Sequence, residues 1–150
     1  YEISNFARAG YECRHNKDCW DFCDYIGFGT AAHSFTKGER YANTADMDKY
    51  INFWKKGISS RESAVEGGIS ERTVESIEEL MGDYNMVALR KSEGIDTVDF
   101  ARRFGVDFYE KYAQVILQMA KEGLITDNKG KIALSSRGYD FASRVMEGFI

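Results

Sequence analysis

The feature that most constrains the fold is the alternation of helical patterns and glycines in the second half of the chain. Apolar residues that recur every three or four positions predict a long helix over residues 70–90, capped by Ser70. Its apolar face contains Val74, Ile77, Leu80, Met81, Tyr84 and Val87. Thr97 is expected to cap a shorter helix that ends at Gly105, and a third helix is expected over residues 107–122. This half of the chain is therefore predicted to be mostly helical.

A hairpin and a last helix complete the second half. The sequence LITDNKGKIAL, residues 124–134, predicts two short strands that turn at residues 128–130. Ser135 or Ser136 is expected to begin the last helix. Its inward residues are Phe141, Val145, Met146 and Phe149. The order helix, turn, helix, two-stranded wing, helix is that of a winged-helix domain.

The first half is predicted to contain loops, a few short strands and one helix. The sequence YEISNFA, residues 1–7, alternates in polarity and predicts a strand. Further strands are expected at residues 24–28 and 40–43, and a helix capped by Thr44 is expected over residues 45–56. A polar connector at residues 61–68 is the candidate boundary between domains 1–60 and 61–150. The expected fold class is α+β, with a winged-helix-like C-terminal domain.

Composition narrows the possible functions. The net charge of −4 disfavours a nucleic-acid role for the whole chain, and no apolar run reaches the ~20 residues of a membrane helix. Three cysteines within eleven residues, an odd number, do not form a disulfide framework and indicate a reducing, cytoplasmic location.

Charge also tests the DNA-binding function that a winged helix invites. Residues 95–150 contain eight Lys or Arg and eight Asp or Glu. The would-be recognition helix, residues 107–122, has three acidic side chains against Lys111 and Lys121. A helix that reads a DNA groove needs cationic partners for the phosphates. We therefore expect no nucleic-acid partner and a structural role for this domain.

The segment from Glu12 to Phe35 contains all three cysteines and both histidines of the chain. Cys13, Cys19 and Cys23 have the spacing C-x5-C-x3-C, whereas structural zinc sites place two close pairs on separate knuckles. His15 is available as a fourth ligand, but all four residues lie in one short segment. The pattern favours reduced cysteines that act as small apolar side chains, and no bound metal.

The glycine turn in the same segment fits the dinucleotide fingerprint G-x-G-x-x-A over residues 27–32. Asp46 and Asp48 even lie at the distance that the fingerprint asks for. However, no helical pattern follows the second glycine, as a nucleotide-binding turn requires. The glycines remain suited to a close approach of the backbone to a ligand or a strand.

These residues resemble a known family. The sequence YEISNFARAGYECRHNKDCWDFCDYIGFGTAAHSF, residues 1–35, is similar to the back part of radical S-adenosylmethionine (SAM) proteins related to oxygen-independent coproporphyrinogen III oxidase. The most similar branch is that of bacterial heme chaperones. Its pattern is YEISNFA-(R/K)-P-G-Y-E, then H-N-x-x-Y-W, then G-F-G-P-G-A-H-S-Y.

Later matches are weaker, and some positions depart from the pattern. The family's L-R-x-x-x-G-(I/L)-D and L-T-x-x-G are matched by Leu89, Arg90, Gly94, Ile95, Asp96, Leu134, Ser135 and Gly138. The departures are Ala9 for Pro, Cys19 for the Tyr of H-N-x-x-Y-W, and Thr30 and Ala31 for Pro and Gly. Because proline restricts the backbone, its absence at these positions leaves the loops with more conformational freedom before folding.

The resemblance implies that residues 1–60 are the last strand and loops of a partial (β/α) barrel. The family's upstream barrel carries C-x3-C-x2-C, whose thiolates hold a [4Fe–4S] cluster that binds S-adenosylmethionine. Cys19-x3-Cys23 would need a cysteine at position 26, which is Ile26. We therefore expect this chain to be a C-terminal part of such a protein, without radical catalysis of its own.

The resemblance also implies heme binding and delivery in porphyrin metabolism. The residues expected to contact heme are His15, Asn16, Trp20, Gly27, Gly29 and His33. Trp20, Phe22, Tyr25 and Phe28 are expected to provide aromatic walls around His15. Arg14 and Lys17 are candidate partners for the propionates. The expected partners are heme or porphyrin, the upstream barrel and a heme-accepting respiratory protein. The alternatives are a coproporphyrinogen-oxidising enzyme of the same superfamily and a winged-helix nucleic-acid-binding module.

Overall fold

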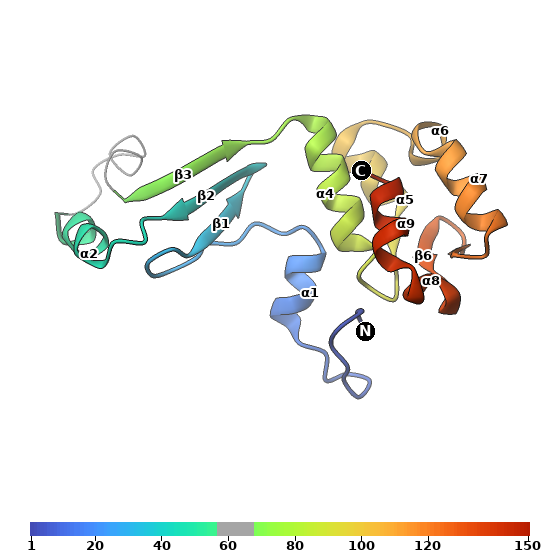
Figure 1. Ribbon diagram of the computed structural model, residues 1–150, viewed down its shortest axis with the longest axis horizontal. Coiled ribbons are helices and arrows are strands. Elements are labelled where there is room, and N and C mark those ends of the chain that lie inside the picture. The colour runs from blue at the N-terminus through green and yellow to red at the C-terminus, as the bar shows by residue number, and fades with distance from the viewer. Residues whose placement is uncertain (57–67) are drawn as a thin grey trace. The chain divides into compact units, whose positions relative to one another are not determined.

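The chain forms two compact units in the computed structural model, which describes residues 1–56 and 68–150 (Figure 1). The first unit combines Tyr1–Phe22 with Ile77–Ile150, and the second is Cys23–Ser76. The predicted connector at residues 61–68 lies, apart from Gly68, outside the described residues. The division into domains 1–60 and 61–150 therefore stays a prediction.

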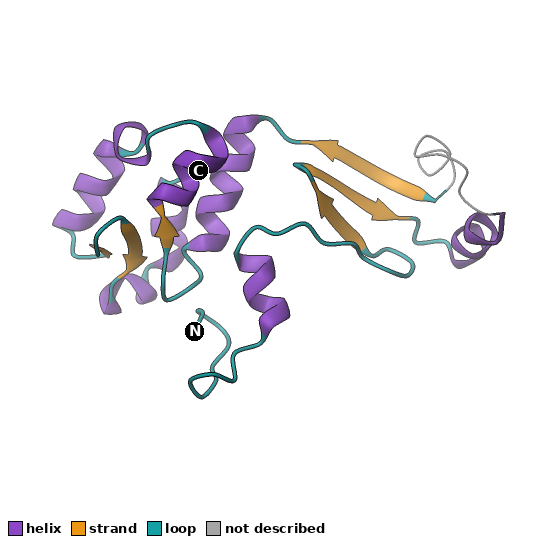
Figure 2. Cartoon of the chain, turned by 180° about the vertical axis from the view of Figure 1, so that it is seen from behind, coloured by secondary structure: helices purple, strands orange, loops and turns teal. Residues whose placement is uncertain are grey.

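The first unit is a helical assembly with a small sheet (Figure 2). Its helices are α1 (Arg14–Trp20), α4 (Ile77–Ala88), α5 (Thr97–Phe104), α6 (Phe108–Lys111), α7 (Ala113–Lys121), α8 (Ser136–Asp140) and α9 (Ala142–Gly148). Its strands are β4 (Ile95–Asp96), β5 (Ile125–Asp127) and β6 (Lys131–Leu134), in the antiparallel order β4-β6-β5. The predicted hairpin is confirmed, because Lys129 and Gly130 both have positive φ, as a two-residue turn of this kind requires.

The core of the first unit is aromatic. Phe100 on α5 is fully buried, and its ring centroid lies 4.9 Å from that of Phe104 and 5.0 Å from that of Phe108. Phe149 stacks on Phe108 at 5.8 Å. Buried Asn85 on α4 donates a hydrogen bond to the Phe149 carbonyl oxygen, at 2.9 Å. Edge-to-face and stacked rings of this kind add stability beyond the apolar area that they bury.

Local signals explain where these helices begin and end. The carboxylate of Asp96 accepts hydrogen bonds from the backbone N–H groups of Val98 and Asp99. The cap of α5 is therefore Asp96, and the predicted cap at Thr97 is wrong. Gly105 ends α5 in the left-handed conformation, with φ +69°, as predicted. The hydroxyl of Ser135 caps α8 as predicted.

Two predicted helices are each divided in the structure. The helix expected over residues 107–122 is α6 and α7, which separate at Tyr112, and the last helix is α8 and α9, which separate at Phe141. Both residues have φ below −100°, outside the helical range. The ring of Tyr112 is buried in the core, so its packing overrides the helical pattern there. Phe141, which had been expected to face inward, is 45% exposed.

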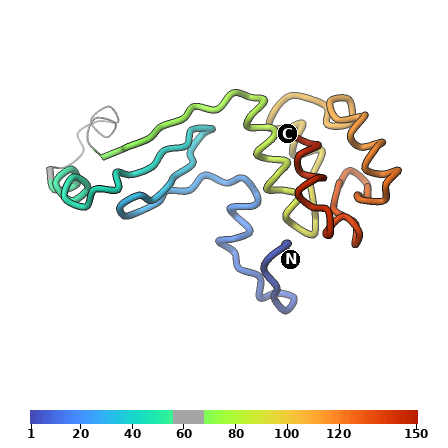
Figure 3. The backbone as a smooth tube through the Cα atoms, in the orientation of Figure 1, coloured from blue at the N-terminus to red at the C-terminus, as the bar shows by residue number. Residues whose placement is uncertain are grey.

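The N-terminal segment belongs to the first unit, and the strand predicted over residues 1–7 is wrong. Only an isolated bridge between Glu2 and Lys91 forms (Figure 3). The buried carboxylate of Glu2 accepts from Arg90 Nη2 at 3.2 Å, and the Ile3 N–H donates to the Arg90 carbonyl oxygen at 2.9 Å. A buried ion pair, rather than a sheet, therefore fixes this segment.

The described residues of the second unit form an antiparallel sheet and a helix. Its elements are β1 (His33–Thr36), β2 (Glu39–Asn43), α2 (Met47–Lys56) and β3 (Ile69–Val74), and the strand order is β1-β2-β3. The β1–β2 turn has positive φ at Lys37 and Gly38. β2 agrees with the prediction. α2 is confirmed, but it begins at Met47, after Asp46, whose carboxylate accepts from the Lys49 N–H, so the predicted cap at Thr44 is wrong. The strand predicted at residues 24–28 shrinks to a bridge between Tyr25 and Phe35, and residues 69–74 form β3 where a helix had been expected.

Candidate functional site

The predicted site residues are divided between the two units. His15, Asn16 and Trp20 lie on α1 of the first unit. Gly27 and Gly29 precede β1, and His33 begins it, in the second unit.

Helix α1 is anchored on one side and exposes an imidazole on another. The guanidinium carbon of Arg90 lies 4.5 Å from the ring centroid of Trp20, so that one face of the indole is covered. Asn16 donates to the Tyr1 hydroxyl at 3.4 Å. His15 is exposed, and its Nε2 lies 4.0 Å from the Sγ of Cys19, one helical turn away. An accessible imidazole nitrogen and a thiol sulfur thus lie next to each other on an anchored helix.

The aromatic surroundings expected for His15 are only partly available. Phe22 has φ +57° and packs its ring edge-on against Tyr84, at 5.9 Å between centroids. Lys17, a candidate for a propionate, lies 3.9 Å from a carboxylate oxygen of Glu93. Asn16 binds a tyrosine hydroxyl and does not contact the imidazole in any hydrogen bond of the described residues. His15 thus presents a solvent-accessible imidazole on α1.

The glycine turn of the second unit is held by four hydrogen bonds. Asn43, which is buried, donates through Nδ2 to the carbonyl oxygens of Gly27 at 3.1 Å and Gly29 at 2.8 Å. The Gly27 N–H donates to Ser34 Oγ at 2.9 Å, and the Gly29 N–H donates to the Tyr50 hydroxyl at 3.0 Å. The turn is therefore rigid, and it is not shaped as a phosphate-binding loop because both of its glycine N–H groups are occupied.

Both glycines are required by the backbone. A Cβ on Gly27 would lie 2.2 Å from the carbonyl oxygen of His33, and Gly29 has φ +104°. Between them, Phe28 points outward with 84% of its surface exposed. The pinned turn thus presents a phenyl ring to the solvent.

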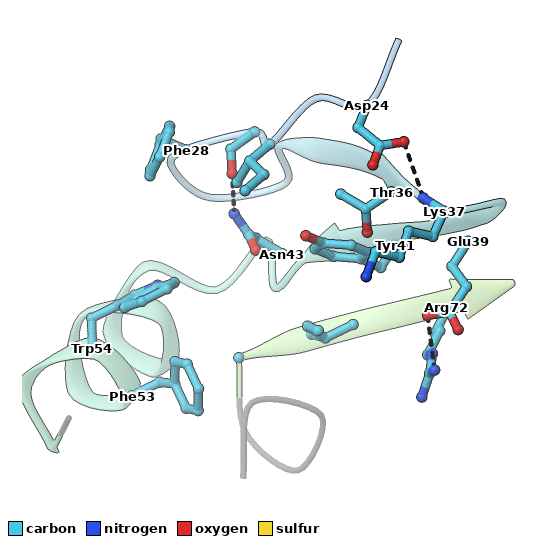
Figure 4. A pocket seen from close by; sticks show the side chains of 14 residues that line it. Asp24, Phe28, Thr36, Lys37, Glu39, Tyr41, Asn43, Phe53, Trp54 and Arg72 are labelled. Atoms are coloured by element: carbon cyan, nitrogen blue, oxygen red, sulfur yellow. Dashed lines mark hydrogen bonds and ion pairs between the residues drawn. The ribbon is translucent and has the colours of Figure 1, made fainter. Parts of the chain in front are cut away.

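The exposed ring belongs to a pocket of about 460 Å³ in the second unit (Figure 4). The pocket lies between the glycine turn, the β1–β2 hairpin, α2 and β3. Its aromatic lining consists of Phe28, Tyr41, Phe53 and Trp54. Gly68 lets the Phe53 ring approach, since a Cβ there would lie 2.5 Å from that ring. Apart from Gly27 and Phe28, the residues of this pocket were not predicted from the sequence, because its walls come from segments far apart in the chain.

The charges at this pocket nearly cancel. Arg72 donates to a carboxylate oxygen of Glu39 at 2.8 Å. The carboxylate of Asp24 accepts from the backbone N–H of Lys37 at 3.1 Å. The ammonium group of Lys37 makes no ion pair within the described part of the chain. The pocket is therefore mainly apolar, and its rim carries the Lys37 ammonium group and the Asp24 carboxylate, which form no ion pair with each other.

A second cavity, of about 250 Å³, lies in the first unit and is polar. Lys91 pairs with Asp21, and Arg103 pairs with Asp99. Tyr84 donates to Asp99 at 3.0 Å, and burial together with the Asp99 charge raises the pKa of Tyr84 well above its usual range. These groups neutralise one another, so the cavity has the character of a structural ion-pair network.

Within residues 1–56 and 68–150, no group of three or more His, Cys, Asp or Glu side chains is arranged to hold a metal ion. No helix of these residues is long and apolar enough to cross a membrane.

The chain is similar to proteins of tetrapyrrole metabolism. The family model described as HemN C-terminal domain matches residues 76–141. Heme chaperone HemW of Bacillus subtilis is 32% identical over the whole chain, and that of Lactococcus lactis is 28% identical. The chain spans 38% and 37% of these two proteins. Heme chaperone HemW of Escherichia coli is 54% identical over 33 residues, which are 22% of this chain and 9% of that protein.

A solved structure shows the same fold. It is described as "Coproporphyrinogen III oxidase (HemN) from Escherichia coli is a Radical SAM enzyme", and it matches with a TM-score of 0.60 and 14% identity. The match covers 85% of this chain and 28% of that one. The fold is thus a mixed helix and sheet architecture related to the C-terminal domain of HemN.

These matches confirm the resemblance that the sequence predicted. The class is that of proteins with a C-terminal domain related to that of HemN. Within this class, the chain is similar over its whole length to the heme chaperones called HemW.

Proposed function

We propose that this chain is the part of a HemW-like heme chaperone that contacts heme and helps to hand it to a heme-accepting respiratory protein in the cytoplasm. The proposal is supported by the family and by one structural observation: His15 presents an accessible imidazole on α1, whose other side chains anchor the helix. Heme iron accepts a histidine nitrogen as an axial ligand.

The imidazole nitrogen that α1 presents is a suitable ligand for heme iron. When heme binds, its iron supplies the open coordination position that an imidazole nitrogen fills. His15 supplies that nitrogen, and Trp20, through its contact with Arg90, fixes the helix that carries it. Because the imidazole is exposed, an acceptor protein can approach it, as delivery requires. His33 is the competing ligand, since it is also exposed at the start of β1.

A heme titration followed by the Soret band tests this proposal. We expect His15→Ala to shift the band and to weaken binding at least about tenfold, which corresponds to ~1.4 kcal/mol. His33→Ala should leave both unchanged. Cys19→Ser removes the thiol next to the imidazole, and it should keep the band position if the imidazole alone binds the iron. If His15→Ala behaves like the unchanged chain, His15 is not the ligand.

The radical chemistry of the family is placed outside this chain in the same proposal. The [4Fe–4S] cluster and S-adenosylmethionine would be held by an upstream barrel, of which residues 1–60 would be the last part. After anaerobic iron–sulfur reconstitution, we expect no stoichiometric cluster absorption and no reductive cleavage of S-adenosylmethionine. Cluster absorption with methionine release would favour the alternative, a coproporphyrinogen-oxidising enzyme.

The winged-helix-like arrangement is proposed to be structural. Its support is the element order α4, β4, α5, α6–α7, β5, β6 and the sheet order β4-β6-β5. The exposed side of α7 carries Gln114, Leu117 and Gln118, without a basic stripe. Binding to mixed-sequence duplex DNA with submicromolar affinity and a steep salt dependence would contradict this role.

A further inference from the structure

We propose that the pocket of the second unit binds the flat face of a tetrapyrrole macrocycle and needs no iron to do so. The inference rests on the proposed function, since it takes the ligand class from heme handling. It concerns other residues, however, and a different kind of contact from the His15 ligand. A site for the ring and a ligand for the metal can therefore be tested separately.

The pocket has the dimensions and lining of a small-molecule site. Its volume of about 460 Å³ lies within the ~300–1,000 Å³ typical of such sites, which are mainly apolar with few polar groups. Trp54 is 46% exposed and Phe28 84% exposed, and Figure 4 shows both at the pocket. Planar rings favour offset stacking on a flat aromatic ligand over contact with water.

The pocket is also held in place before any ligand arrives. Asn43, Ser34 and Tyr50 fix the glycine turn that carries Phe28. The ring of Trp54 contacts Phe53 edge-on, with 5.4 Å between the centroids. Aromatic side chains that are already ordered lose little entropy on binding, so they contribute more of their contact energy to affinity.

The pocket is lined by two cations and two carboxylates, among which the Lys37 ammonium group is the one available to a carboxylate on an apolar ligand. Arg72 is already paired with Glu39, so it offers a ligand little. Lys37 is the lining cation that makes no ion pair within the described residues, and it lies on the hairpin turn next to the pocket. A tetrapyrrole with carboxylate side chains would place its ring on the aromatic walls and one carboxylate at Lys37.

Fluorescence of Trp54 is the direct readout of this proposal. The chain has two tryptophans, so Trp20→Phe leaves Trp54 as the single reporter. We expect iron-free protoporphyrin to quench Trp54 saturably. Phe28→Ala in this background should weaken binding at least about tenfold. Because Phe28 is almost fully exposed, its loss should not disturb folding.

Two controls separate specific from general binding. Met47→Ala, on α2 but not part of the pocket, should leave the affinity unchanged. Lys37→Met should weaken binding of the dicarboxylate porphyrin several-fold and leave the dimethyl ester unaffected. Absence of quenching, or equal affinity in Phe28→Ala and the reference chain, would overturn the proposal.

The outcome is distinguishable from failure of the proposed function. A heme Soret band that depends on His15, together with no quenching by iron-free porphyrin, would refute this pocket alone. Saturable quenching that depends on Phe28, together with a Soret band insensitive to His15, would refute the iron ligand alone.

Discussion

The two units of the chain distribute their large apolar side chains in opposite ways. In the first unit, residues such as Phe100, Phe108 and Phe149 are almost completely buried. In the described part of the second unit, Phe35 and Ala42 are the buried apolar side chains, while Phe28 and Trp54 remain in contact with solvent. Burial of aromatic area stabilises a fold, whereas exposed aromatic groups serve contact with something else. The first unit therefore has an aromatic core, whereas the second leaves aromatic rings accessible to a ligand.

The largest effect expected from this comparison is the loss of a buried ring. Phe100→Ala should lower the free energy of unfolding by ~3–5 kcal/mol, because it leaves a cavity among four other rings. Trp54→Ala should change it by less than ~1 kcal/mol. Chemical denaturation of both variants measures the difference, and Phe100→Leu extends the series if Phe100→Ala does not fold. Equal losses would show that the second unit also depends on its aromatic residues for stability.

A smaller effect is expected at glycines that differ in their surroundings. Gly94 has φ +73°, and a Cβ there would lie 2.1 Å from the Ile132 carbonyl oxygen on β6. Gly94→Ala should therefore cost more than ~2 kcal/mol. Gly10 has φ +85° but no atom within 4 Å of such a Cβ, so Gly10→Ala should cost ~1 kcal/mol. Thermal unfolding compares the two, and similar melting temperatures would contradict a tightly packed β4–β6 contact.

The buried ion pair of the first unit should make its stability depend on pH. Burial alone would raise the pKa of Glu2, but hydrogen bonds from Asn5 and Ser4 and the charge of Arg90 outweigh it, so the pKa lies below its usual 4.5. A carboxyl group with a lowered pKa stabilises the fold above the unfolded-state pKa, and this contribution is lost as the pH falls through the folded-state pKa.

Glu2→Gln tests this ion pair. At pH 7 the variant should be less stable by ~1–3 kcal/mol, and the difference should shrink as the pH falls below 4.5. The control is Glu93→Gln, whose side chain is 58% exposed and 3.9 Å from Lys17, and a surface pair of this kind contributes ~0–1 kcal/mol. A constant difference between Glu2→Gln and the unchanged chain at all pH values would exclude the carboxylate as the cause.

The sequence predicted the first unit better than the second. Helix α5 and the β5–β6 hairpin follow from local signals, namely Gly105 and the turn at Lys129 and Gly130. β3 was mistaken for a helix, because five of its six residues are exposed and its polarity carries no period-two pattern. Its pairing with β2, which lies outside the local sequence, decides its structure.

The candidate site shows the same limit. His15 could be found because it belongs to a short motif, although its helix α1 could not, since RHNKDCW has no helical apolar pattern. The aromatic pocket could not be predicted, because Phe28, Tyr41 and Trp54 come together only through the folding of the sheet and α2. Tertiary packing brings these distant segments together, and no local sequence pattern predicts that contact.

Hydrogen–deuterium exchange with and without saturating heme tests the division between a stable unit and a ligand-contacting surface most directly. Bound ligand slows the exchange of amides whose opening it opposes. The account predicts slower exchange in α1 and in the segment from Ile26 to Trp54, and unchanged exchange in α5, β4 and β6. Protection confined to α7 and the β5–β6 hairpin, or no change anywhere, would contradict it.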